Sequence, residues 1–97
     1  MPPAPRSIAA TAMFVDLRGF TAMSRRSSPV RVVEVLTEYY ALVERVCERE
    51  GGVITQFLGD GVVVVFGAPL QPLADHPRAA VRAALGLQRA LAERNAV

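Results

Sequence analysis

One stretch of β-forming residues, interrupted by a tight turn, constrains the fold most. Residues 53–58 and 62–66 are rich in β-branched and aromatic side chains, and Gly59, Asp60 and Gly61 stand between them. An Asp-Gly pair flanked by such runs is typical of a β-hairpin. The sequence therefore predicts two antiparallel strands joined at Asp60.

Further elements precede this hairpin. Residues 8–15 are short and mostly apolar, which predicts a buried strand. A short helix is expected over residues 19–26. Ser28 followed by Pro29 is typical of a helix start, and apolar residues with helical spacing continue to about Arg49. We expect that long helix to bury one of its adjacent tyrosines in the core.

A second long helix is predicted from His76 to about Arg94, with Asp75 as its N-cap. The element order is then β-α-α-β-β-α. A right-handed crossover makes the first two strands parallel, and the hairpin returns the third strand between them, antiparallel to both. This is an α+β, ferredoxin-like split β-α-β fold with an antiparallel sheet. Such a fold has a fourth strand after the last helix, so we expect the sequence to be truncated before it.

Composition excludes several classes of function. Eleven basic and nine acidic residues give a net charge of only +2, which offers no basic surface for nucleic acid. No apolar run approaches the ~20 residues of a membrane helix. The single cysteine, Cys47, fits a buried position in a cytoplasmic protein. We therefore expect a flexible tail at residues 1–7 and one cytoplasmic domain over residues 8–97, with no nucleic-acid partner and no membrane contact.

Two acidic residues are predicted to meet at one edge of the sheet. Asp16 follows the first strand and Asp60 lies in the hairpin turn. The expected topology makes the first and third strands neighbours, so the two carboxylates should lie within a few ångströms. Paired carboxylates repel each other unless a cation lies between them, and Mg²⁺ takes such oxygen ligands together with phosphate. Taken singly, Asp60 fits a simple turn residue and Asp16 a cap.

A turn that follows Asp16 adds a possible phosphate site. Gly19 permits close backbone approach, and we expect free N–H groups at Phe20, Thr21 and Ala22. Helix starts of this kind favour phosphate groups. Together with the two acids, the turn indicates a nucleoside triphosphate bound with metal ions.

Three blocks of sequence resemble a known family. They are FVDLRGFT at residues 14–21, FLGDG at 57–61 and VFGAP at 65–69. In this order and spacing, and over about residues 8 to 95, they resemble class III adenylate and guanylate cyclase catalytic domains, of which the chain would be the N-terminal half.

The resemblance implies a two-metal site. Asp16 and Asp60 match the aspartates that bind two Mg²⁺ or Mn²⁺ ions and serve catalysis. Leu17 matches a residue whose backbone carbonyl contacts one of these ions. Two ions suit the displacement in which a 3′-hydroxyl attacks its own α-phosphate.

The resemblance also implies nucleotide contacts. Gly19, Phe20 and Thr21 match the turn whose amides hold the triphosphate, and Gln56 matches a base-recognition position that is usually Lys in adenylate cyclases. Because a Gln amide both donates and accepts, it does not select adenine over guanine by itself.

The implied function is conversion of ATP, or alternatively GTP, to a 3′,5′-cyclic nucleotide and pyrophosphate, with a homodimer or a complementary cyclase subunit as partner. The resemblance places the transition-state Asn and Arg and a second base-reading residue after position 97, so we expect the isolated chain to be inactive or nearly so. Two alternatives stay open. One is a catalytically inactive cyclase-like module for metal-nucleotide binding or dimerisation. The other is a ferredoxin-like sensor or interaction module without a nucleotide.

Overall fold

The computed structural model describes residues 8–67 and 73–95, with three strands and three helices in this part of the chain. In chain order they are β1 (Thr11–Asp16), α1 (Phe20–Arg26), α2 (Pro29–Arg49), β2 (Val53–Leu58), β3 (Gly61–Phe66) and α3 (His76–Asn95). The predicted order β-α-α-β-β-α is confirmed. Both the expected tail at residues 1–7 and most of the predicted loop at 70–74 lie outside the described residues.

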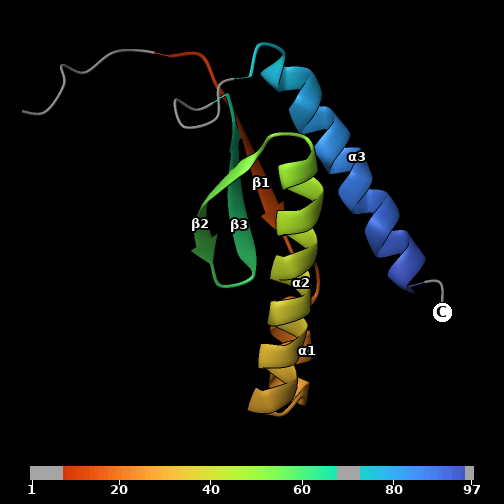
Figure 1. Ribbon diagram of the computed structural model, residues 1–97. Coiled ribbons are helices and arrows are strands. Elements are labelled where there is room, and N and C mark those ends of the chain that lie inside the picture. The colour runs from red at the N-terminus through yellow and green to blue at the C-terminus, as the bar shows by residue number, and fades with distance from the viewer. Residues whose placement is uncertain (1–7, 68–72, 96–97) are drawn as a thin grey trace, which may run out of the picture.

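The three strands form one antiparallel sheet in the order β1-β3-β2, with α2 and α3 packed together on one side of it (Figure 1). The central position of β3 follows from the chain path. The hairpin forces β3 to run beside β2, and the helical crossover leaves β1 on the other side. The predicted α+β split arrangement is therefore confirmed for the described residues.

Helix α2 begins where its local chemistry predicts. The Ser28 hydroxyl accepts a hydrogen bond from the Arg31 N–H at 3.2 Å, and Pro29 occupies the first turn, where a missing N–H costs nothing. The helix ends at Arg49 with Glu50 as its C-cap, and the next residue, Gly51, has a φ of +83° in the left-handed region. Both ends of α2 therefore lie at residues that favour a helix end in the sequence.

The core lies between the sheet and the two long helices. Phe66, Val62 and Val64 project from β3 onto this side, and Val43 and Cys47 of α2 cover them with no exposed surface. Small residues of α3 complete the layer: Ala79, Ala80 and Ala83. Because alternate residues of a strand point to opposite faces, the remaining residues of β3 face the open side of the sheet.

The structure corrects the bounds of β1. It begins at Thr11 and ends at Asp16, whereas the sequence predicted residues 8–15. Strand β3 explains the later start, since its last residue, Phe66, pairs with Thr11 and offers no partner to Ile8. Asp16 is thus the last residue of the strand, paired with Gly61.

No helix in residues 8–67 and 73–95 is long and apolar enough to cross a membrane.

Candidate functional site

The end of β1 and the β2–β3 turn lie side by side. Asp16 is in register with Gly61, and the Leu17 N–H donates to the Asp60 carbonyl at 3.1 Å. This bond extends the β1–β3 pairing by one residue and attaches the turn to the end of β1. As a result, the backbone brings Asp16 and Asp60 to the same edge of the sheet.

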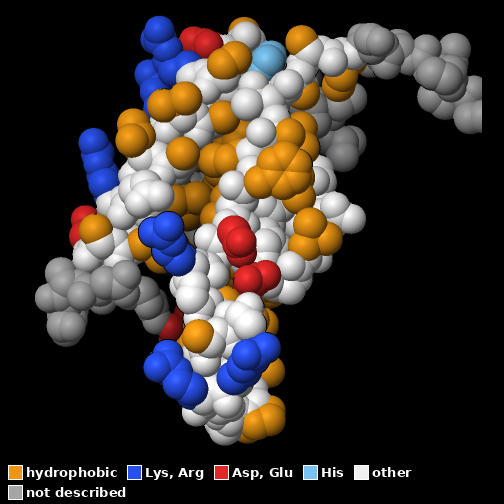
Figure 2. Space-filling model, turned by 180° about the vertical axis from the view of Figure 1, so that it is seen from behind, with side chains coloured by type: hydrophobic (Ala, Val, Ile, Leu, Met, Phe, Trp, Pro, Cys, Tyr) orange, Lys and Arg blue, Asp and Glu red, His pale blue; other side chains and the backbone are white. Residues whose placement is uncertain are grey.

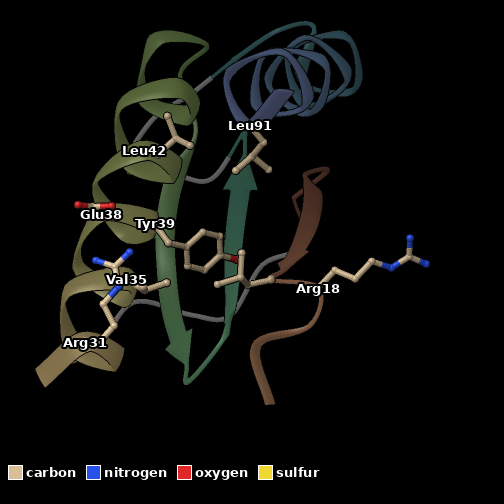
Figure 3. Close-up of a pocket in the computed structure, with 8 residues that line it drawn as sticks. Arg18, Arg31, Val35, Glu38, Tyr39, Leu42 and Leu91 are labelled. Atoms are coloured by element: carbon tan, nitrogen blue, oxygen red, sulfur yellow. The ribbon is translucent and has the colours of Figure 1, made fainter. Parts of the chain in front are cut away.

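Both carboxylates lack a neutralising partner within the described part of the chain. Two ion pairs of the described residues join Arg31 to Glu34 and Arg78 to Asp75, and neither involves Asp16 or Asp60. Figure 3 shows the nearest cation in sequence, Arg18, with its guanidinium directed away from α2 and the sheet. Acidic side chains lie close together on the face in Figure 2, next to a patch of hydrophobic side chains. Such a site has negative charge available for a cation.

The donors at this edge fit a hard divalent ion. Two carboxylates and the Leu17 carbonyl are all oxygen ligands, and Mg²⁺ commonly takes one or two protein carboxylates and completes its shell with phosphate and water. The described residues contain no cluster of three or more His, Cys, Asp or Glu that would form a closed metal cage. The donor set thus favours an ion shared with a phosphate ligand over an ion held by protein alone.

The turn after Asp16 differs from expectation in one respect. Gly19 has φ +77°, and a Cβ there would meet no atom within 4 Å, so the turn is open to an approaching ligand. The Phe20 N–H, however, donates to the Leu17 carbonyl at 3.3 Å, so the prediction of a free N–H at Phe20 is wrong. The cause is the tight 17–20 turn itself. A carbonyl has two lone pairs, so the Leu17 carbonyl retains one as a free acceptor.

Gln56 shares a sheet face with Asp16. It pairs with Val63, and Val63 pairs in turn with Phe14, so all three side chains lie in one row on the face opposite the helices. Phe14 is 76% exposed, and Gln56 is exposed too. Asp16 follows two residues after Phe14 on this face. A ligand bound at the acids could therefore extend along the open sheet toward Gln56.

Tyr39 and Tyr40 lie near the site, and the sequence did not predict the surroundings of their hydroxyl groups. Tyr39 enters the core as expected for one of the pair, but its buried hydroxyl has no hydrogen-bond partner in the structure. Burial, together with the negative charges of Asp16 and Asp60, raises the pKa of Tyr39 to about 12. The Tyr40 hydroxyl donates to the Gly59 carbonyl, next to Asp60. No sequence pattern signals that contact.

A cavity of about 320 Å³ lies on the helix side of the sheet (Figure 3). Strand alternation places Asp16 on the opposite face, so the cavity is separate from the open face that carries Gln56. Its lining residues come from the segment after β1, from α2 and from α3: Leu17, Arg18, Arg31, Val35, Glu38, Tyr39, Leu42 and Leu91.

Comparisons with known proteins agree with this architecture. The family model for the adenylate and guanylate cyclase catalytic domain matches residues 3–97. Adenylate cyclase 1 of Rhizobium meliloti (strain 1021) is 40% identical over 81 residues, which are 84% of this chain and 12% of that protein.

Solved structures show the same fold. The guanylyl cyclase Cya2 superposes with a TM-score of 0.80 at 40% identity, over 87% of this chain and 42% of that one. The guanylate cyclase domain of RhGC from Catenaria anguillulae, solved in complex with GTP, gives a TM-score of 0.75 at 29% identity, over 80% of this chain and 42% of that one. The chain thus spans less than half of these solved chains and about an eighth of the curated relative. With its split β-α-β sheet and its acidic edge, this chain belongs to the adenylate and guanylate cyclase catalytic domain family.

Proposed function

We propose that this chain binds a nucleoside triphosphate together with two divalent ions, Mg²⁺ or Mn²⁺, through Asp16 and Asp60. The observation that carries the proposal is the pairing of Asp16 with Gly61 and of the Leu17 N–H with the Asp60 carbonyl. These contacts bring two carboxylates without ion-pair partners to one edge of the sheet. The reaction that we propose for the complete domain is conversion of ATP, or alternatively GTP, to the 3′,5′-cyclic nucleotide.

In this reaction the 3′-hydroxyl gives up its proton to water and its oxygen forms a bond to the α-phosphorus. The bond from the α-phosphorus to the oxygen that bridges the α- and β-phosphates breaks, and pyrophosphate leaves with that electron pair. Bound divalent ions supply stabilisation of the negative charge that develops on the phosphate oxygens. Asp16, Asp60 and the Leu17 carbonyl would hold them. The open turn at Gly19 allows the triphosphate to approach the backbone, with Thr21 supplying an amide.

The proposed site accepts either adenine or guanine as the base of the nucleotide. Gln56 lies on the face along which the ligand would extend, and its amide both donates and accepts hydrogen bonds. Relatives of both kinds support this reading, because an adenylate cyclase and a guanylyl cyclase each match at 40% identity. We therefore propose ATP as the first substrate to test and GTP as the second.

Turnover is proposed to need more than these 97 residues. The chain spans 42% of the solved guanylyl cyclase Cya2, and the resemblance places the transition-state Asn and Arg in the remainder. A homodimer of the complete domain, or a complementary cyclase subunit, would supply them. The 97-residue chain by itself is then a metal-nucleotide-binding module of the cyclase family.

Calorimetry with Mn²⁺ and a non-hydrolysable ATP or GTP analogue tests this proposal. Asp16→Asn and Asp60→Asn keep the side-chain size and remove the charge. We expect each to weaken binding by at least about tenfold, since even groups that only support metal ligands are worth about 10–100-fold. Asp75→Asn is the matched control, because Asp75 is exposed and pairs with Arg78 at the start of α3. It should leave the affinity unchanged.

Two results would contradict the proposal. Equal affinity of the wild type and of Asp60→Asn for the Mn²⁺-nucleotide analogue would show that Asp60 does not hold the ligand. Robust formation of cyclic AMP or cyclic GMP by the purified chain alone would refute the need for further residues.

A further inference from the structure

The turn that carries Asp60 is held from a helix as well as from a strand. Tyr40 of α2 donates its hydroxyl proton to the carbonyl of Gly59, which is 19 residues away in the chain. Its ring also packs on Phe57 of β2, with ring centroids 4.7 Å apart and planes inclined by 59°. Figure 1 shows the β2–β3 turn lying beside the middle of α2. Tyr40 therefore contacts both the strand before the turn and the turn itself.

The contacts restrain both peptide planes that flank Asp60. The Gly59 carbonyl belongs to the peptide before the Asp60 Cα and accepts from Tyr40. The Asp60 carbonyl belongs to the peptide after it and accepts from the Leu17 N–H. A residue has only two soft backbone dihedrals, and each is a rotation of one of these planes about the Cα. With both planes bonded, the direction of the Asp60 Cα–Cβ bond is set.

The turn needs this restraint because its own sequence does not provide it. Gly59 has φ +64° and precedes the acid, and Gly61 follows it. Glycine populates more backbone conformations than any other residue, so the glycines beside Asp60 permit the tight turn but restrain its backbone less than other residues would. A cation site, in contrast, requires ligands held within about half an ångström of their working positions.

We infer that Tyr40 is a positioning residue for Asp60, which orients the carboxylate toward Asp16 by holding the Gly59 carbonyl. The inference rests on the proposed function, because the position of Asp60 affects a ligand only if the site binds a metal-nucleotide. The contact itself is independent of that function. Tyr40 acts on the ligand only through the hairpin backbone and touches neither metal nor nucleotide.

The chain offers a matched pair of variants for the test. Tyr40→Phe keeps the ring that packs on Phe57 and removes only the hydroxyl. Tyr39→Phe, one residue earlier, removes a hydroxyl that has no hydrogen-bond partner in the structure. Both variants retain an aromatic side chain on α2, so the difference between them reports the Gly59 contact.

The first measurement is backbone ¹⁵N relaxation of the ligand-free chain. In Tyr40→Phe, we expect the order parameter of the Asp60 and Gly61 amides to fall from about 0.85, the value of rigid backbone, toward about 0.6. In Tyr39→Phe it should not change. An unchanged Asp60 order parameter in Tyr40→Phe overturns the inference, and so does an equal fall in both variants.

The second measurement is calorimetry with the Mn²⁺-nucleotide analogue. Tyr40→Phe should weaken this binding by about threefold to tenfold, the usual effect of one hydrogen bond, and leave binding of the metal-free nucleotide unchanged. A general loss of structure would weaken both. If the wild type does not bind the metal-nucleotide, the proposed function fails, while the order parameters still decide the role of Tyr40. Normal metal-nucleotide affinity in Tyr40→Phe overturns the positioning role.

Discussion

Among the glycines of the described residues, Gly52 has the least room for a side chain. A Cβ built there would lie 2.7 Å from Cε1 of Phe66 and 2.8 Å from Cγ1 of Val64, and both of these side chains are fully buried. Neither neighbour can move without disturbing the packed layer under α2. We expect Gly52→Ala to lower the free energy of unfolding by about 1–3 kcal/mol through overpacking, measured by urea denaturation.

The control for this substitution is Gly61→Ala in the neighbouring strand. A Cβ at Gly61 would find its nearest atoms at 3.6 Å, an ordinary van der Waals contact, and its φ lies outside the left-handed region. Its stability should change by less than about 0.5 kcal/mol. A similar loss in both variants would mean that glycine matters here for a reason other than space.

At the scale of the element, α2 links the core to the site. It supplies five buried core residues, and it also carries the hydroxyl that contacts the β2–β3 turn. The helix is fixed at its start by Ser28, whose side chain accepts from the Arg31 N–H. Because Ser28 is exposed, its hydroxyl adds no packing, and its contribution to stability is that of the cap alone.

Ser28→Ala should therefore lower the free energy of unfolding by about 1 kcal/mol, the usual value of a serine N-cap. Chemical denaturation followed by circular dichroism measures it. Ser24→Ala is the matched control, because the Ser24 hydroxyl donates to the Thr21 carbonyl within α1 and caps no helix. A loss in Ser24→Ala as large as that in Ser28→Ala would contradict the cap interpretation.

The elements were predictable where a local rule defines them. Ser28 and Pro29 predicted the start of α2, and the Asp60-Gly61 pair predicted the hairpin, because caps and tight turns depend on residues adjacent in sequence. The start of β1 was not predictable in this way. Ile8 is as apolar as the strand that follows, and only the length of its partner β3 decides that pairing begins at Thr11.

In the candidate site, too, some features were predictable from the sequence and others were not. That Asp16 and Asp60 share an edge follows from the chain path and the handedness of the crossover, so the sequence could predict it. The bond from the Phe20 N–H to the Leu17 carbonyl was missed because it depends on the actual dihedrals of a turn. The bond from Tyr40 to Gly59 was missed because it depends on how far along α2 the hairpin comes to lie.

At the scale of the whole molecule, burial in the core raises the pKa of two weakly acidic side chains, the phenol of Tyr39 and the thiol of Cys47. Burial raises the pKa of the Cys47 thiol from 9.0 to about 11. The pKa of Tyr39 rises from 10.0 to about 12, mainly through burial and also through Asp16 and Asp60. Both groups are neutral when protonated, so the folded chain holds these protons more tightly than the unfolded chain does. Their contribution to stability is complete below pH 9 and is lost as the pH rises through 11 and 12.

This linkage predicts a steep alkaline loss of stability. A pKa difference of two units between the folded and the unfolded chain contributes at most about 3 kcal/mol to the free energy of unfolding for each group. The sequence contains no lysine whose titration would overlap with these groups. Urea midpoints measured from pH 8 to 12 should therefore fall above pH 9. In the double variant Tyr39→Phe, Cys47→Ala the curve should be much flatter, whatever its stability at pH 8. Parallel curves for the two proteins would show that other groups control the alkaline transition, and would remove Tyr39 and Cys47 from the account of how the core depends on pH.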